Sequence, residues 1–259
     1  MSKAKAKLQK EIEDGIGEHN KRKTRKKSAI SKTEFDKCGV ELTEKQDTLY
    51  KAIKSNTMTL IHGPAGTSKT FTSCYAALAL LANKKVEKII ITKPMEESGN
   101  GGVGYLPGDL EEKTAPFKAS FISNFEKIIG KQNTSMLIST GEIVFEPLAY
   151  MRGSTYDHSV MLLDEAQNCS IKDLMLWSTR LGKGSYAVIM GDTSQYDVSE
   201  KYSGFSDYIK MAEGMKKLFN FKFENDDIVR NKFLIELTNR YDKYRNDKEK
   251  EKEKKKESK

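Results

Sequence analysis

Eight consecutive residues combine glycines with a lysine and a hydroxyl group in a spacing that is typical of a phosphate-binding loop. They are Gly63, Pro64, Ala65, Gly66, Thr67, Ser68, Lys69 and Thr70. A β-prone run at 57–62 precedes them and an Ala- and Leu-rich helical pattern at 71–82 follows, as such a loop requires. Its backbone N–H groups turn inward around phosphate oxygens at the positive end of the helix dipole. We expect Lys69 between the β- and γ-phosphates of ATP and the Thr70 hydroxyl on Mg²⁺. The alternative is a glycine-rich turn before a helix.

One position of this loop departs from the usual pattern, which has glycine immediately before the lysine. Ser68 stands there. A Cβ atom is acceptable at this position if φ is negative, whereas a positive φ strains any residue other than glycine. The φ angle of Ser68 therefore decides whether the substitution weakens phosphate affinity or shifts the loop.

Two adjacent carboxylates, Asp164 and Glu165, follow the apolar run SVMLL at 159–163. Adjacent side chains at a strand end point in opposite directions, so the two acids can have different roles. We expect Asp164 to hold Mg²⁺ through water and Glu165 to polarise the attacking water as catalytic base. Together with the phosphate loop, this pair predicts nucleotide hydrolysis. The alternative is a solvated strand terminus.

Two glutamines are candidates for reading the nucleotide. Gln195 lies in GDTSQ, directly after the apolar run at 186–190, where a polar side chain can reach the γ-phosphate or its water. The alternative is a turn that contains Asp192. Gln46 lies shortly before the first strand and is a candidate for reading an adenine edge. The alternative is a surface glutamine.

Hydrolysis also needs positive charge on the transition state in addition to Lys69. The candidates are Arg152 in MRGST, Arg180 in STRLG and Arg230 in DIVRN. Each has the alternative role of a surface or packing arginine.

Short apolar runs separated by helical patterns must position these residues. The strand candidates are 57–62, 88–92, 142–146, 159–163 and 186–190. Such strands predict an α/β fold of the P-loop NTPase type, a parallel sheet with helices on both faces. Ligands bind at the carboxyl ends of the strands in these sheets, and nearly every candidate strand ends in a polar motif. Residues 95–140 have no firm assignment.

The length of 259 residues predicts one domain at 40–242, with a basic, partly disordered extension at 1–39 and a charged tail at 243–259.

Cys38, Cys74 and Cys169 lie far apart and lack metal-ligand spacing, so we expect thiols in a reducing compartment. No apolar run approaches the roughly 18 residues of a membrane span, and we find no signal peptide pattern. We therefore expect a cytoplasmic protein without membrane contact.

The net charge of +8 is concentrated in the two ends of the chain. Residues 1–37 carry 12 Lys and Arg against 6 Asp and Glu, and residues 243–259 carry 9 against 5. The rest of the chain has a slight acidic excess. The ends can attract nucleic acid without sequence preference, or they can be solubilising tails.

The motifs together resemble those of the PhoH-like ATPases, over roughly residues 40–242. The resemblance rests on GPAGTSKT (63–70), TKP (92–94), LPGD (106–109), EEKTAPF (111–117), PLAYMRGST (147–155), LLDEAQN (162–168), TRLG (179–182), GDTSQYD (191–197) and DIVRN (227–231). That family is similar to the RecA-like motor core of superfamily 1 helicases. The resemblance implies a RecA-like fold, an adenine-reading Gln46, a sensing Gln195 and a functional arginine at Arg230.

Two further features qualify the resemblance. Lys93 stands where the family usually has arginine, so the positive charge is kept but the bidentate hydrogen bonding of a guanidinium is not. Some relatives carry an N-terminal nuclease domain, which the short basic segment before residue 40 does not predict.

The leading hypothesis is an Mg²⁺-dependent ATPase coupled to binding or remodelling of single-stranded RNA or DNA, as in a helicase-like motor. A single domain of this kind lacks the second domain that usually supplies an arginine, so we expect self-assembly into a ring. The resemblance favours a hexamer. The alternative is a nucleotide-gated binding or scaffold protein with little turnover. A small-molecule kinase fits less well, because the sensing glutamine motif is present and no acceptor-binding lid is evident.

Overall fold

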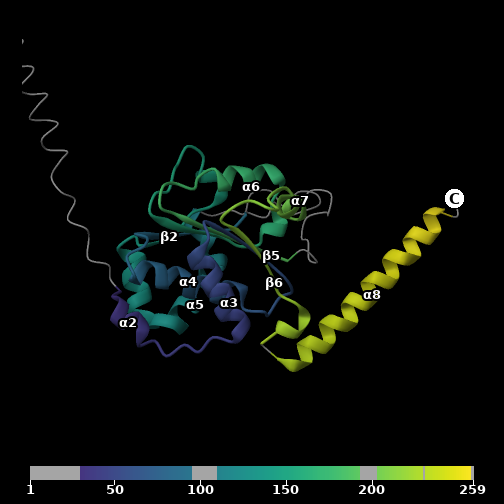
Figure 1. The fold of residues 1–259 in the computed structure, drawn as a ribbon, viewed down its shortest axis with the longest axis horizontal. Helices are drawn as coiled ribbons and strands as arrows, with labels where there is room; N and C mark the ends of the chain where they lie inside the picture. Colours follow the sequence, from purple (N-terminus) through teal and green to yellow (C-terminus); the bar gives the residue numbers. More distant parts are fainter. Residues whose placement is uncertain (1–29, 95–109, 193–202, 230, 258–259) are drawn as a thin grey trace, which may run out of the picture.

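The computed structural model describes residues 30–94, 110–192, 203–229 and 231–257, and within them only the backbone at 110–117, 232, 246 and 249–257. Its centre is a six-stranded sheet in the order β3-β2-β4-β5-β1-β6 (Figure 1). Each neighbouring pair of strands is parallel. The strands are β1 (Met58–His62), β2 (Lys88–Thr92), β3 (Ile143–Phe145), β4 (Ser159–Leu163), β5 (Tyr186–Gly191) and β6 (Leu218–Lys222).

The connections between these strands are mostly helical. The α-helices are α2 (Lys32–Asp36), α3 (Glu44–Ser55), α4 (Lys69–Ala82), α5 (Leu110–Ser139), α6 (Ile171–Ser178), α7 (Phe205–Met211) and α8 (Lys232–Glu257). Short 3₁₀ turns are η1 (Leu148–Tyr150), η2 (Ala166–Asn168) and η3 (Asn225–Asp227). The path of α5 is interrupted at Gly130, where φ is 79° and ψ is 161°.

Alternating strand residues serve two separate cores, one on each face of the sheet. In β2, Ile89 and Ile91 pack with α3, α4 and α5, whereas Ile90 packs on the opposite face with α6 and α7. Both faces are therefore covered, as predicted from the continuous apolar runs. Each large apolar side chain buried in this way contributes about 1.5–3 kcal/mol. The two cores therefore pack against both faces of the strands that lead to the carboxyl edge of the sheet.

Helix α8 projects from this body (Figure 1). Its first half is tied to η3, because the Asn225 amide donates to Asn239 Oδ1 at 2.7 Å and to Asp242 Oδ2 at 2.9 Å. The helix continues through residue 242 into the charged C-terminal segment. Among the described helices, none has both the length and the apolar composition that crossing a bilayer requires.

The predicted strands are confirmed with shifts of at most one residue at either end, and those at 88–92 and 159–163 match without any shift. Helix α4 begins two residues earlier than the predicted 71–82, at Lys69. Strand β6 and helix α5 were not anticipated. The observed topology is that of an α/β P-loop NTPase with a parallel, RecA-like sheet.

Candidate functional site

The glycine-rich loop lies at the carboxyl end of β1 and leads directly into α4. The Lys69 ammonium folds back over it, donating to the carbonyl of Gly63 at 2.6 Å and to that of Pro64 at 2.9 Å. The Thr67 hydroxyl also donates to the Pro64 carbonyl, at 2.9 Å. The loop therefore encloses its own lysine, which is the side chain that would face an incoming phosphate.

The path of this loop depends on Gly63, whose φ is 144°. A Cβ atom there would collide with the backbone oxygen of Phe223, and it would lie 2.7 Å from the Phe223 Cβ atom. The Phe223 N–H in turn donates to the carbonyl of His62 at 2.8 Å. Glycine therefore lets the segment after β6 pack directly on the start of the loop.

Ser68 adopts the left-handed region, with φ 66° and ψ 26°. A Cβ atom would be free of strain here only if φ were negative, so the backbone of Ser68 is strained. Such a conformation costs a residue with a side chain roughly 1 kcal/mol relative to glycine. Ser68 still begins α4 in the usual register, because its carbonyl accepts from Thr72 N at 2.9 Å.

Asp164 lies beside Thr70, with 3.4 Å between its Oδ2 and the Thr70 Oγ1 atom. Its backbone N–H donates to the Thr92 carbonyl at 3.0 Å and so continues the pairing of β4 with β2. Burial, and then the charge of Glu165, raise the pKa of Asp164 to about 6. The two side chains that were predicted to share a metal ion are thus adjacent, although 94 positions separate them in the sequence.

This pair of oxygen donors fits Mg²⁺. Magnesium prefers oxygen ligands and commonly takes one or two from the protein, with phosphate and water completing its shell. Thr70 Oγ1 and Asp164 Oδ2 are such a set at the mouth of the loop. Among the described residues, no group of three or more His, Cys, Asp or Glu forms a cage of its own.

Glu165 contacts Lys93 and Gln167, whereas Asp164 lies beside Thr70. The backbone of Glu165 is left-handed, with φ 56°. Its Oε1 atom lies 3.8 Å from the Lys93 Nζ atom, and its Oε2 atom accepts from the Gln167 amide at 2.6 Å. Lys93, in the position where the resemblance implied arginine, therefore faces the proposed base.

Sequence reasoning assigned no role to Gln167. It is 3% exposed, and its Oε1 atom accepts from the backbone N–H of Asp192 at 3.0 Å. The side chain thus connects the acids after β4 with the GD motif after β5. The only signal in the sequence was its place within LLDEAQN.

Lys69 is affected by the charges of three carboxylates of this site. Burial lowers the pKa of Lys69, and the charges of Asp192, Asp164 and Glu165 oppose that shift. An ammonium at the start of a helix, with carboxylates in the same site, can attract a polyphosphate together with its cation.

Gln46 is buried, with 6% exposure, so the alternative of a surface glutamine is wrong. It is the third residue of α3. Its side-chain Oε1 atom accepts from the Thr43 backbone N–H at 3.0 Å, and its backbone N–H donates to Thr43 Oγ1. It lines a cavity of about 400 Å³ together with Thr67, Phe223 and Val229. This cavity adjoins the phosphate loop at Thr67, and its lining combines the apolar Phe223 and Val229 with polar and charged side chains.

The arginine candidates are dispersed. Arg180 donates to the carbonyls of Leu176 and Ser154 at 3.2 and 3.1 Å. Its own carbonyl accepts from Tyr156 N, just before β4, so Arg180 lies at the amino edge of the sheet, opposite the phosphate loop.

Arg152 is exposed. It follows Met151, whose sulfur accepts from the Thr92 hydroxyl at the carboxyl end of β2. Gln195 and Arg230 lie outside the described residues.

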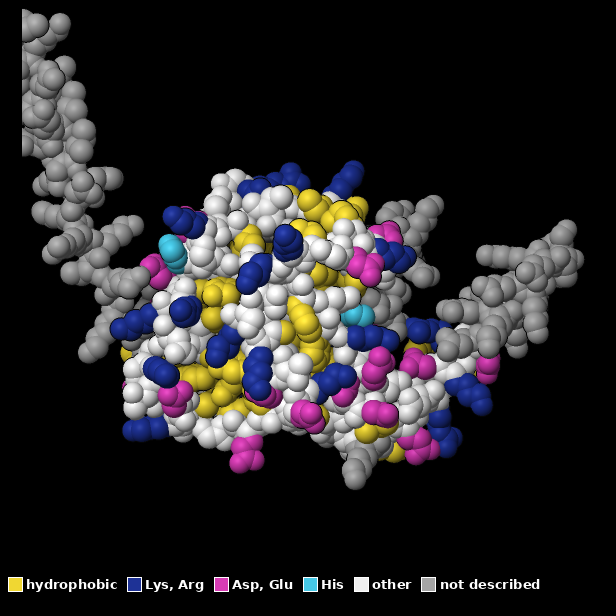
Figure 2. Space-filling view, viewed as in Figure 1, with side chains coloured by type: hydrophobic (Ala, Val, Ile, Leu, Met, Phe, Trp, Pro, Cys, Tyr) yellow, Lys and Arg dark blue, Asp and Glu magenta, His cyan; other side chains and the backbone are white. Residues whose placement is uncertain are grey.

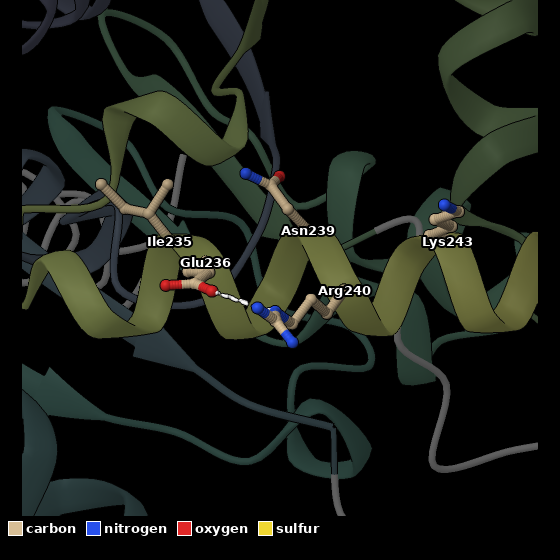
Figure 3. Close-up of a pocket in the computed structure, with 5 residues that line it drawn as sticks. All are labelled: Ile235, Glu236, Asn239, Arg240 and Lys243. Carbon is tan, nitrogen blue, oxygen red and sulfur yellow. Dashed lines mark hydrogen bonds and ion pairs between the residues drawn. The ribbon is translucent and has the colours of Figure 1, made fainter.

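A second hollow, of about 540 Å³, lies along one side of α8 (Figure 3). Ile235, Glu236, Asn239, Arg240 and Lys243 line it, and Glu236 pairs with Arg240 at 2.6 Å. None of the predicted site residues contributes to this hollow. The candidate site is therefore the carboxyl edge of the sheet and not the larger hollow on α8.

A family model described as PhoH-like protein matches residues 40–242. The chain belongs to the PhoH-like protein family. A PhoH-like protein of Bacillus subtilis is 37% identical over 193 residues, which cover 74% of this chain and 60% of that protein. Protein PhoH of Escherichia coli K12 is 33% identical over 186 residues, which cover 70% of this chain and 51% of that protein. This PhoH-like chain thus spans about half to three fifths of the length of these relatives.

Among solved structures, the large terminase of a thermophilic bacteriophage aligns with 75% of this PhoH-like chain and 49% of its own. The TM-score is 0.47 and the sequence identity is 11%. The family match and the sheet order together identify the fold as that of a P-loop NTPase.

Proposed function

We propose that this PhoH-like chain binds ATP with Mg²⁺ and hydrolyses it, with Glu165 as the base that activates water. The observation that supports this best is the contact between Thr70 Oγ1, at the end of the phosphate loop, and Asp164 Oδ2. It joins the end of the loop to the acid of the neighbouring motif, and the charge of that acid also acts on Lys69. Positioning and charge of this kind are most of what phosphoryl transfer requires.

Each part of the site has a place in this proposal. The loop from Gly63 to Thr70 cradles the phosphates, and Lys69 neutralises the charge that develops on them. Thr70 and Asp164 hold the cation. Gln46 and the adjoining cavity take the adenine base, because a carboxamide can both donate to and accept from the edge of the base. Gln195 senses the γ-phosphate, as the family resemblance implies.

The hydrolysis would be coupled to single-stranded RNA or DNA, in the cytoplasm. The family resemblance and the basic ends of the chain support this coupling. On the face shown in Figure 2, the described Lys and Arg side chains are spread out and do not gather into one patch. Because the net positive charge of the chain lies in its ends, we assign much of the initial attraction to the extensions at 1–39 and 243–259, which flank the ATPase domain at 40–242.

An arginine from a second copy would complete the site. Arg180 is tied to its own chain at the amino edge of the sheet, away from its own phosphate loop. Arg152 is exposed, and Arg230 is the family candidate. A head-to-tail ring, with the hexamer favoured, would bring such an arginine to the neighbouring loop. Sedimentation of the active protein tests this, and a fully active monomer would exclude it.

The decisive experiment compares wild type with Glu165→Gln, with and without single-stranded RNA or DNA, at low and moderate salt. We expect the variant to retain ATP binding and to lose about 10²- to 10⁴-fold in turnover, the usual contribution of a general base. Glu213→Gln, at an exposed position after α7, is the matched control. If wild type binds ATP without turning it over under any condition, the nucleotide-gated scaffold becomes the better interpretation.

A further inference from the structure

A buried carboxamide bridges the two motifs that flank the proposed reaction centre. Gln167 lies in η2, two residues after Glu165, and is 3% exposed. It contacts the Glu165 carboxylate at 2.6 Å on one side and the Asp192 backbone at 3.0 Å on the other. The first contact lies after β4 and the second after β5, so this one side chain spans two adjacent strands of the sheet.

The partners fix which way the amide points. A backbone N–H can only donate, so the Gln167 atom that faces Asp192 must be the oxygen. The NH₂ group then necessarily faces Glu165 and donates to its carboxylate. Both polar ends of Gln167 are therefore satisfied, and the bond to Glu165 is charge-assisted, which makes it stronger than a bond between neutral groups.

The surrounding backbone leaves space for this side chain and restricts its movement. A Cβ atom on Gly191 would lie 3.0 Å from Gln167 Oε1 and 2.6 Å from the Phe205 ring. The η2 turn is closed by a hydrogen bond from Asn168 N to the Glu165 carbonyl at 2.9 Å. Glu165 and Gln167 are thus held in one tight turn against the end of β5.

We propose that Gln167 is the positioning residue for Glu165, an inference that rests on the proposed ATPase function. It fixes one carboxylate oxygen and leaves the other, Oε1, facing Lys93 at 3.8 Å. A base held in one orientation before the substrate arrives need not be ordered during the reaction. Through the same two hydrogen bonds, the orientation of the Glu165 carboxylate depends on the position of Asp192, and hence on the end of β5.

The test is Gln167→Glu, which keeps an acceptor for the Asp192 N–H but replaces the donor to Glu165 with a second carboxylate. At pH 8 we expect kcat to fall about 10- to 100-fold, as is typical when a group that orients a reactive ligand is removed. The dissociation constant of ATP, measured by fluorescence titration, stays within about twofold, because the Gln167 amide bonds to Glu165 and Asp192 and not to the phosphate loop. Gln132→Glu, at an exposed position of α5, is the matched control.

A double-mutant cycle separates positioning from a merely structural role. In a Glu165→Gln background, the Gln167→Glu change should cause no further loss of turnover, because its effect passes through Glu165. The same double variant recreates an amide-to-carboxylate hydrogen bond with the partners exchanged. Its melting temperature should therefore exceed that of Gln167→Glu alone, while its turnover stays at the Glu165→Gln level.

Several results would overturn the inference. Gln167→Glu with wild-type kcat, with a higher basal rate, or with kcat and ATP affinity falling together would each do so. A further loss of turnover in the Glu165→Gln background would assign Gln167 a structural role instead. If wild type hydrolyses no ATP, the proposed function fails and with it the positioning role. The melting temperatures then show separately whether the bond between residues 165 and 167 exists.

Discussion

At the scale of single residues, Asp164 is a candidate site carboxyl that the fold buries. Its pKa rises from 3.8 to about 6, chiefly because the carboxyl is buried. Between these two values the folded protein binds more protons at this site than the unfolded chain does. The contribution of Asp164 to stability without metal is therefore present below about pH 4 and is lost as the pH rises through about 6.

We therefore predict that Asp164→Asn stabilises the metal-free protein at pH 7.5. The expected gain is on the order of 2–3 kcal/mol at most, since each pKa unit corresponds to about 1.4 kcal/mol. Urea unfolding in EDTA at pH 4.5 and pH 7.5 measures it, and the gain should be smaller at the lower pH. The variant should also lose the protection against unfolding that Mg-ATP gives wild type.

Asp207→Asn provides the control for this prediction, because the Asp207 side chain is 74% exposed. It should change the urea midpoint little at either pH. An Asp164→Asn protein that is less stable than wild type at pH 7.5 in EDTA would show that the buried carboxylate is better solvated than its surroundings suggest.

The sequence allowed residue roles to be predicted where a motif carries the geometry. Thr70 and Asp164 were expected to share a cation, and they are adjacent. The φ of Ser68 could not be predicted, because residue type alone does not fix the turn that the loop adopts. The partner of Gln167 is a backbone N–H 25 positions later, and no local pattern encodes such a contact.

At the scale of elements, predictions succeeded where the apolar pattern was strong and failed where it was broken. The central strands are continuous apolar runs and could be located to within a residue. Strand β6, LFNFK, is an edge strand with mostly exposed or half-buried residues, so its pattern is mixed. Helix α5 runs past Pro116 and Gly130, two residues that usually end a helix.

The junction between β6 and the phosphate loop leads to a prediction at this scale. Gly63→Ala should push Phe223 away from the loop, because the new methyl group meets backbone atoms that cannot rotate aside. Overpacking of this kind costs typically 1–3 kcal/mol, in addition to the cost of the positive φ. We expect a lower urea midpoint and at least tenfold weaker ATP binding in a fluorescence titration.

Gly141→Ala separates these two costs. Its φ is 74°, but no described atom lies within 4 Å of the added methyl group. It should lose only the conformational part, about 1 kcal/mol, and keep its ATP affinity. Equal effects from the two variants would mean that the contact with Phe223 does not shape the loop.

At the scale of the whole molecule, the net positive charge and the candidate site are separated along the chain. The carboxylates and the phosphate loop belong to a body with a slight acidic excess, whereas the excess of basic over acidic residues lies at the two ends. A polyanion attracted by the ends would thus not compete with ATP for the same lysines. This separation predicts that nucleic-acid affinity and basal ATP turnover can be altered independently.

The last prediction tests that separation at the basic segment Lys21–Lys27, whose sequence is KRKTRKK. Replacing its six Lys and Arg residues by Gln should leave ATP turnover without nucleic acid unchanged. It should weaken binding of single-stranded RNA or DNA most strongly at low salt. The slope of log affinity against log salt should shrink by about 0.7 for each phosphate that the segment no longer neutralises.

Fluorescence anisotropy at several salt concentrations measures the nucleic-acid affinity and its salt slope. Lys127→Gln with Lys131→Gln, two exposed positions of α5, is the control. An unchanged slope in the Lys21–Lys27 variant, with a reduced slope in the control, would place the nucleic-acid contacts on the folded body instead.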